Sequence, residues 1–106
     1  MSPQQLKEFE EILLKRKKAI EEEIESISKE LKEMIDFSAV EIEDVVYWAQ
    51  LKTLSESDQA LLKKLQEELV AINRALQRIK EGTYGKCKDG TEIPIEKLKA
   101  DPLYEC

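Results

Sequence analysis

The amino-acid sequence predicts an all-α protein, built as a long antiparallel helical hairpin (coiled coil) with a small C-terminal appendage. Three observations predict this fold. Apolar residues recur with seven-residue spacing in two separate stretches of the chain. Charged residues make up 38% of the 106 residues, a proportion that suits helices burying only a narrow apolar stripe. The three glycines and three prolines all lie near the two ends, so the middle contains no strong helix breaker.

The first helix is predicted to begin at Pro3 and to run to about Ile35. Ser2 is a good capping residue, proline suits the first helical position, and Gln5 can close a capping box with Ser2. From there the repeat forms a continuous apolar seam along one helix face. The members of this first seam are Leu6, Phe9, Leu13, Ile20, Ile24, Ile27, Leu31 and Met34.

A second seam predicts a second long helix that ends just before Gly82. Its members are Leu51, Leu54, Leu61, Leu65, Leu69, Ile72, Leu76 and Ile79. A glycine directly after the last periodic residue is a typical helix stop. Because neither helix can hide its seam alone, we expect the two to fold back on each other as an antiparallel pair.

The two seams also predict a register for this pair. The expected partners are Leu6 with Ile79, Leu13 with Ile72, Ile20 with Leu65, and Met34 with Leu51. This register puts the turn near residues 36–48 and sets Asp58 against Ile27. We therefore expect Asp58 either to point outward or to fix the register at some cost in stability.

The predicted turn carries an unusual group of acidic and aromatic side chains. Six residues there are candidates for binding a partner, namely Glu41, Glu43, Asp44, Tyr47, Trp48 and Ala49. A plain hydrophilic turn is the alternative interpretation, but Val45 and Val46 next to the aromatic pair give more apolar surface than such a turn needs. Ser38 and Glu41 can form a capping box, so the second helix can start as early as Ala39.

Charge and composition argue against several classes of function. The net charge is -6, so the chain lacks the basic footprint that direct DNA binding requires. It contains no histidine, the usual general base, and no phosphate-binding glycine loop, so we expect no enzymatic activity. No apolar run approaches the roughly 20 residues that span a membrane, and no secretion signal begins the chain. We therefore expect a cytoplasmic protein whose partner is another protein.

The end of the second seam and the residues after it carry a family resemblance. The Ala75–Cys87 stretch reads ALQRIKEGTYGKC and resembles the junction between coiled coil and zinc finger in DksA/TraR proteins, which commonly reads ALxRIxxGTYGxC. The Glu92–Pro102 stretch, EIPIEKLKADP, resembles the continuation of that finger, GEPIPxxRLxAxP. The resemblance implies a coiled-coil hairpin over 1–81 and a degenerate zinc-finger-like segment over 82–106.

The resemblance also implies a function. DksA/TraR proteins are bacterial transcription regulators that bind RNA polymerase through its secondary channel and place an acidic coiled-coil tip near the active centre to modulate initiation. Some of them respond to the alarmone guanosine tetraphosphate in the stringent response, which makes this nucleotide a second expected partner. The alternative function is a structural coiled coil that dimerises or acts as a scaffold and has no role in transcription.

The tip motif of the family can be matched to this chain in two ways. It commonly reads DxxDxA at a fixed distance before GTYG, and at that distance Asp44 and Ala49 carry over, while Tyr47 stands where the second aspartate is expected. The rival match, over 55–60 (SESDQA), is closer letter by letter. It ranks second because it would shorten the second helix by about three turns and leave the end of the first helix unpaired.

The two cysteines are the remaining part of the resemblance. The family's full finger holds zinc with two CxxC pairs, whereas this chain has Cys87 and Cys106, with Asp89 as a possible oxygen ligand and Gly90 where a second cysteine belongs. A structural zinc site needs four ligands, so we expect no cofactor, with zinc at these three residues as the less favoured alternative, and regard the cysteines as free, inert thiols rather than as ligands or a disulfide. A small apolar core can hold the segment without metal, formed by Tyr84, Ile93, Ile95, Leu98 and Leu103.

Overall fold

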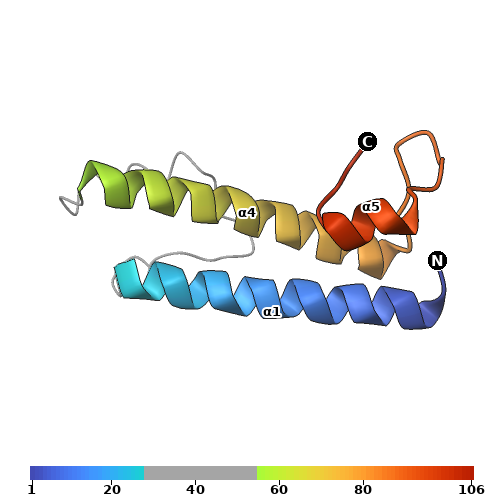
Figure 1. The fold of residues 1–106 in the computed structure, drawn as a ribbon, viewed down its shortest axis with the longest axis horizontal. Coiled ribbons are helices and arrows are strands. Elements are labelled where there is room, and N and C mark those ends of the chain that lie inside the picture. Colours follow the sequence, from blue (N-terminus) through green and yellow to red (C-terminus); the bar gives the residue numbers. More distant parts are fainter. Residues whose placement is uncertain (28–54) are drawn as a thin grey trace. The chain divides into compact units, whose positions relative to one another are not determined.

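The computed structural model describes residues 1–27 and 55–106. Within these ranges the chain is all-α, with the long helices α1 (Pro3–Ile27) and α4 (Glu56–Glu81) packing together and the short helix α5 (Ile95–Ala100) following (Figure 1). The described ranges contain no β-strand, and their one β-like feature is an isolated bridge between Lys86 and Glu92. The predicted all-α class is thus confirmed. The predicted end of the first helix near Ile35, the turn, and the Met34–Leu51 pair lie outside the described residues.

The chain divides into two compact units. The first combines Met1–Arg16 with Ala71–Cys106, and the second is Lys17–Val70. Each of the two long helices therefore contributes one part to each unit.

The start of α1 follows the predicted capping box. The backbone N–H of Gln5 donates to the Ser2 hydroxyl at 3.2 Å, and the Ser2 N–H donates to the Gln5 side-chain oxygen at 3.0 Å. These reciprocal bonds satisfy two donors that would otherwise have no partner within the helix. The prediction that the first helix begins at Pro3 is confirmed.

In the first unit, the opening turns of α1 lie alongside the closing turns of α4 and run in the opposite direction (Figure 1). Leu13 and Ile72 are both fully buried, as the expected pairing requires. Leu6 and Ile79, a second expected pair, are half-buried. The core is completed by residues from both helices and from the segment after α4, namely Phe9, Ala75, Tyr84, Ile93 and Leu98.

The core of the second unit is drawn from both long helices. Among the described residues of this unit, the buried ones are Ile20, Ile24, Leu62, Leu65, Gln66 and Leu69. The predicted seam position at Leu61 is wrong, because Leu61 is 37% exposed and Leu62 is fully buried in its place. Both residues satisfy a step of three or four from Leu65, so spacing alone does not distinguish them.

The start of α4 corrects a second prediction. We expected a helix that continues unbroken through Leu51 and Leu54, but α4 begins at Glu56. The Ser55 hydroxyl accepts a hydrogen bond from the Asp58 N–H at 3.1 Å, and Glu56 and Asp58 put negative charge in the first turn. A capping serine followed by carboxylates is a strong local start signal. Asp58 is partly exposed at this helix start, so its carboxylate is not buried in an apolar seam.

The end of α4 follows the prediction. The Gly82 N–H donates to the Ile79 carbonyl at 3.3 Å, and the Thr83 N–H donates to the Arg78 carbonyl at 2.9 Å. Gly82 has a φ of 80°, a conformation that glycine adopts without steric cost. This combination is a Schellman motif, in which the last helical carbonyls receive donors from the residues that follow.

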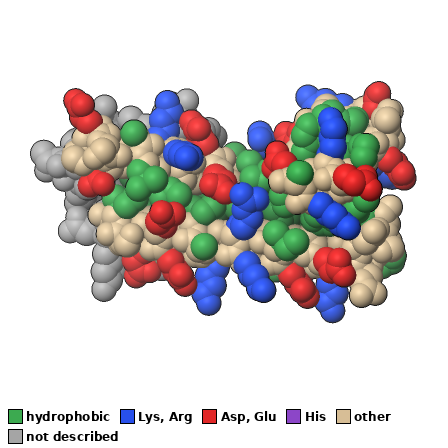
Figure 2. Space-filling model, viewed as in Figure 1, with side chains coloured by type: hydrophobic (Ala, Val, Ile, Leu, Met, Phe, Trp, Pro, Cys, Tyr) green, Lys and Arg blue, Asp and Glu red, His purple; other side chains and the backbone are tan. Residues whose placement is uncertain are grey.

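The surface carries charges of both signs. Figure 2 shows acidic and basic side chains interspersed over the visible face, with apolar side chains between them. Among the described residues, no helix has the length and apolar character needed to cross a membrane.

Candidate functional site

The residues after α4 form a tight loop held by backbone hydrogen bonds. The Cys87 N–H donates to the Thr91 carbonyl at 2.8 Å, the Gly90 N–H to the Cys87 carbonyl at 3.0 Å, and the Ile93 N–H to the Gly85 carbonyl at 2.8 Å. We call residues 85–93 the Cys87 loop. Gly85 is buried with a φ of 84°, and a Cβ on it would lie 2.8 Å from Met1 Cε, so the loop packs closely against the start of the chain.

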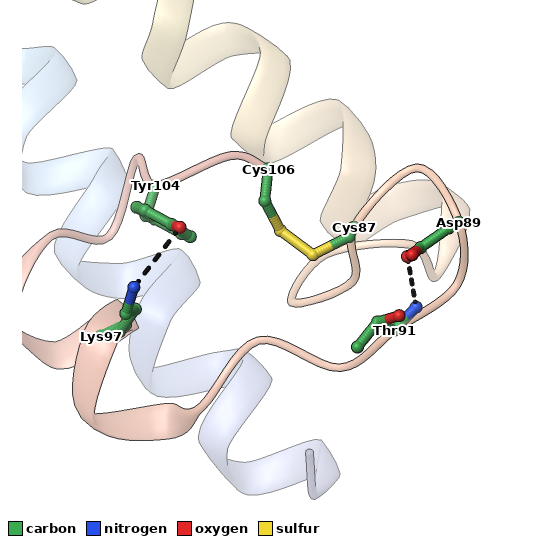
Figure 3. Close-up of a disulfide and its surroundings, with 6 residues drawn as sticks. All are labelled: Cys87, Asp89, Thr91, Lys97, Tyr104 and Cys106. Atoms are coloured by element: carbon green, nitrogen blue, oxygen red, sulfur yellow. Dashed lines mark hydrogen bonds between the residues drawn. A yellow bond between two sulfur atoms is a disulfide. The ribbon is translucent and has the colours of Figure 1, made fainter.

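Asp89 belongs to the structure of this loop. Its carboxylate accepts a 2.9 Å hydrogen bond from the Thr91 N–H (Figure 3). Hydrogen bonds from Thr91 hold the pKa of Asp89 below its usual value, because they stabilise the charged form. The side chain is therefore engaged within the turn that follows Cys87.

Tyr84 anchors the loop to the rest of the first unit. Its ring is 4% exposed and lies 5.7 Å from the Phe9 ring, centroid to centroid, while its hydroxyl donates to the Pro102 carbonyl at 2.8 Å. Burial raises the pKa of Tyr84 to about 12, against an opposing effect of the nearby Arg78 charge. One side chain thus connects α1, the end of α4 and the segment after α5.

The predicted apolar core of this segment is largely confirmed. Tyr84, Ile93 and Leu98 are buried, whereas Ile95 and Leu103 are half-buried.

The prediction that the two cysteines are free thiols is wrong. Cys87 and Cys106 form a disulfide, with their Cα atoms 5.0 Å apart and 19 positions between them in sequence (Figure 3). Two anchors bring Cys106 back to the Cys87 loop: the Tyr84–Pro102 hydrogen bond and ion pairs from α4 to Glu105. These contacts join residues far apart in sequence, and cysteine spacing alone does not reveal them.

Glu105 is held by two arginines of α4. The Arg78 guanidinium donates a hydrogen bond to its carboxylate, and Arg74 Nε lies 3.5 Å from the same oxygen, Oε1. The bond from Arg78 is the main reason why the pKa of Glu105 lies below its usual value. The carboxylate is 41% exposed, so solvent screens these interactions.

The three candidate metal ligands do not converge as a metal site. Both cysteine sulfurs are joined to each other, and the Asp89 carboxylate faces Thr91 (Figure 3). In residues 1–27 and 55–106, no group of three or more His, Cys, Asp or Glu side chains could hold a metal ion. A zinc-finger character of this segment is therefore not shown, and its fold is held by apolar packing and a disulfide.

A hollow of about 400 Å³ lies beside the disulfide. Its lining includes both cysteines, three cations and an aromatic ring, namely Cys87, Cys106, Arg78, Lys86, Lys88 and Tyr104. Lys97 reaches over the Tyr104 ring, 4.8 Å from its centroid, and its ammonium lies 3.5 Å from the phenolic oxygen (Figure 3). This hollow was not predicted, and the only sequence signal for it is the presence of lysines on both sides of Cys87.

The candidate partner-binding residues of the predicted tip are Glu41, Glu43, Asp44, Tyr47, Trp48 and Ala49, and all of them lie outside the described residues. The rival match over 55–60 is described. It forms the capped start of α4, with Ser55 before the helix and Asp58 in its first turn.

Comparison with known proteins gives one partial relationship. The chain is similar to General stress protein 16O of Bacillus subtilis (strain 168), with 48% identity over 52 residues. The matched region is 48% of this chain and 28% of the relative, so the chain spans less than a third of that protein. No protein-family model matches the chain, and no solved structure matches it.

Proposed function

We propose that this protein is a bacterial transcription regulator of the DksA/TraR type, which binds RNA polymerase through the secondary channel and places acidic side chains of its helical pair near the active centre. On this proposal it acts in the cytoplasm, has no enzymatic activity of its own, and modulates initiation.

The main observation in support of the proposal is the role that the junction sequence ALQRIKEGTYGKC has in the structure. Within it, Ala75 is buried between the helices, Gly82 ends α4 in a Schellman motif, and Tyr84 is buried against Phe9. The residues that carry the resemblance are thus the ones that join a helical pair to a compact C-terminal segment. That is the layout which the resemblance predicts.

Two further observations agree with the proposal. The paired helices α1 and α4 have buried apolar seams and charged outer faces, as a helical probe requires. The relative with 48% identity is by its name a general stress protein, and regulation of transcription is one way in which a protein can serve a stress response.

The position at which α4 starts favours the rival match of the tip motif, over residues 55–60. The first match, with Asp44 and Ala49, ranked higher because it allowed one long second helix. Since α4 begins at Glu56, the argument from helix length no longer applies, and Asp58 becomes a second candidate for the acidic contact. A polymerase-binding experiment can distinguish Asp44 from Asp58.

The test is a pull-down of core RNA polymerase with the purified chain, using polymerase whose secondary channel is open or is blocked by another bound channel ligand. We expect binding to the open enzyme and competition by the blocking ligand. Asp44→Asn and Asp58→Asn should each leave the helical circular dichroism unchanged, and the variant that removes the contact should reduce binding by about tenfold. Adding guanosine tetraphosphate to the same assay tests it as a second partner.

The matched control is Glu67→Gln, which removes one exposed carboxylate from the middle of α4. It should bind polymerase as the unmodified chain does. Binding that ignores channel blockage, or that falls equally in all three variants, would contradict the proposal.

A second candidate function is self-association as a structural coiled coil. Exposed apolar side chains on α1 favour it, because Ile12 is 43% and Leu14 48% exposed. Sedimentation equilibrium separates the two functions. A stable dimer that loses its association on Ile12→Lys, and that does not bind polymerase, would favour the structural role.

A further inference from the structure

The Cys87–Cys106 disulfide joins a firmly held loop to a weakly held segment. On the Cys87 side, the Cys87 loop is closed by three backbone hydrogen bonds of 2.8–3.0 Å, two of which form the isolated β-bridge between Lys86 and Glu92. Its Ile93 is buried in the core. None of these contacts involves a sulfur atom, so the loop has its own means of staying folded.

On the Cys106 side, the last buried contact is the hydrogen bond from Tyr84 to Pro102. Residues 103–106 follow it, and we call them the terminal segment. Leu103 is half-buried, and the other contacts of the segment are polar and partly exposed: Leu103 N–H to Asp101 Oδ1 at 3.1 Å, Tyr104 N–H to the Asp101 carbonyl at 3.0 Å, the Lys97 ammonium 4.8 Å from the centroid of the Tyr104 ring, and Glu105 to the two arginines. Exposed polar contacts of this kind each contribute little to stability. The disulfide is therefore the strongest connection between the terminal segment and the rest of the unit.

We propose that this disulfide is a reversible thiol–disulfide exchange site, at which a low-molecular-weight monothiol attacks Cys106 and releases the terminal segment while the Cys87 loop stays folded. The proposal does not depend on the function proposed above.

Exposure and charge around the bond support this direction of attack. Cys106 is exposed whereas Cys87 is only half-exposed, so an incoming thiolate reaches the Cys106 sulfur more easily. The hollow beside the bond has a volume of about 400 Å³, and its charged lining residues are Arg78, Lys86, Lys88 and Glu105, three cations against one carboxylate side chain. Positive charge attracts an anionic nucleophile and stabilises the thiolate that leaves from Cys87.

The reaction balances as two exchange steps. In the first, a monothiolate attacks the Cys106 sulfur, a mixed disulfide forms there, and the electron pair of the broken bond leaves with Cys87 as a thiolate, which takes a proton from solvent. In the second, another monothiolate attacks the monothiol sulfur of the mixed disulfide and releases Cys106. Two monothiols are oxidised to one disulfide, and one protein disulfide is reduced to two thiols.

The first experiment identifies the attacked sulfur. The full chain is incubated with millimolar reduced glutathione as the probe, quenched with acid at intervals, and mapped by peptide mass spectrometry. We expect the transient glutathione adduct on Cys106 to exceed that on Cys87 by at least about fivefold, because of the difference in exposure. An adduct mainly on Cys87, or a bond that millimolar glutathione does not open, would overturn the proposal.

The second experiment follows the segment that is released. Amide hydrogen exchange is compared between the oxidised chain and the chain reduced in the presence of a chelator, which keeps stray metal off the thiols. Reduction should accelerate exchange at Leu103 and Tyr104 by about tenfold or more, and change that at Cys87, Gly90 and Ile93 by less than about twofold. Oxidised glutathione should restore the original pattern.

Two variants test whether the change in hydrogen exchange is caused by loss of the disulfide. The double variant Cys87→Ser/Cys106→Ser should reproduce the reduced pattern without any reductant. Glu105→Gln should accelerate exchange at Tyr104 further in the reduced chain but hardly in the oxidised one, because only the reduced chain depends on the ion pairs. Loss of protection at Ile93 on reduction would show that the Cys87 loop does not stay folded without the bond, and unchanged exchange at Tyr104 would show that the bond does not control the terminal segment; either result would overturn the proposal.

Discussion

The hydroxyl of Tyr84 donates a 2.8 Å hydrogen bond to the carbonyl oxygen of Pro102, and so connects the residue just after α4 to the segment just after α5. The same side chain packs its ring against Phe9 of α1. Three parts of the chain that are distant in sequence thus meet at one buried phenol. Its protonation state should therefore influence the stability of the whole first unit.

Alkaline pH should destabilise the first unit through Tyr84. Its pKa is raised from 10.0 to about 12 by burial, so the folded state retains a proton that the unfolded state has lost. The contribution is fully present below pH 10 and is lost as the pH rises toward 12, on the order of 2 to 3 kcal/mol in total. Urea unfolding monitored by circular dichroism between pH 8 and 12 measures it.

Tyr84→Phe is the matched control for this pH dependence. At pH 8 it should cost about 1 kcal/mol, because the Pro102 carbonyl loses its buried donor. Between pH 10 and 12, the free energy of unfolding should fall much less steeply with pH in this variant than in the unmodified chain. A variant that loses stability with pH as steeply as the unmodified chain would show that other groups cause the alkaline effect.

Gln66 should be a site where an apolar substitution stabilises the protein. Its side chain is fully buried, and neither its amide nitrogen nor its oxygen has a hydrogen-bond partner among the described residues. Burying an unpaired amide is unfavourable, so Gln66→Met should raise the free energy of unfolding by about 1 to 3 kcal/mol. The measurement is urea unfolding at neutral pH.

Gln77→Met is the control for the Gln66 substitution, because Gln77 is exposed and donates to Glu81 at 2.9 Å on the surface of α4. It should change the free energy of unfolding by less than about 0.5 kcal/mol. If Gln66→Met is neutral or destabilising, the amide has a partner or a packing role that its burial does not indicate.

The apolar seam of α1 can be tested with two neighbouring leucines. Leu13 is fully buried and Leu14 is 48% exposed. Leu13→Ala should destabilise the protein by about 2 to 5 kcal/mol, because it leaves a cavity between the helices. Leu14→Ala should cost less than about 0.5 kcal/mol. Similar thermal midpoints for the two variants would mean that the seam faces another way.

Ser55→Ala should loosen the first turn of α4. It removes the hydroxyl that accepts the Asp58 N–H, at an expected cost of about 1 kcal/mol. Amide exchange should accelerate at Asp58, while that at Gln59, which donates to the Ser55 backbone carbonyl at 2.9 Å, should change less. Ser55→Asp keeps a capping oxygen and should behave like the unmodified chain.

Features that depend on a few neighbouring residues could be predicted from the sequence. The Ser2–Gln5 capping box and the helix end at Gly82 both follow from local chemistry, and both agree with the structure. Burial at Leu13 and Ile72 follows from helical periodicity, which reports the inner face of a helix without reference to the partner.

The wrong predictions share a different cause. The choice between Leu61 and Leu62 depends on which face of α4 meets the neighbouring helix, and the start of α4 at Glu56 reflects a capping hydrogen bond to Ser55 that we did not predict from the sequence. Gln66 lies four residues after Leu62 and three before Leu69, so the same periodicity indicates its burial if polar residues are counted too.

The disulfide could not be predicted from the spacing of the cysteines along the sequence. Cys87 and Cys106 meet where the Tyr84–Pro102 hydrogen bond and the Arg78–Glu105 ion pair join the same parts of the chain. Each of these contacts spans at least 18 positions in sequence. These contacts depend on how the whole unit packs. Local sequence patterns therefore do not predict them.

The first unit joins the opening residues Met1–Arg16 to Ala71–Cys106, whereas Lys17–Val70 is one continuous stretch. A ribosome makes the chain from its amino end, so Phe9 emerges long before Tyr84, the ring it packs against. Until then the Phe9 ring lacks its native contact with Tyr84. Contacts between positions so distant in sequence form slowly, because a long loop must close. During synthesis, the Phe9 ring is therefore expected to gain its contact with Tyr84 only after the whole of α4 has been made.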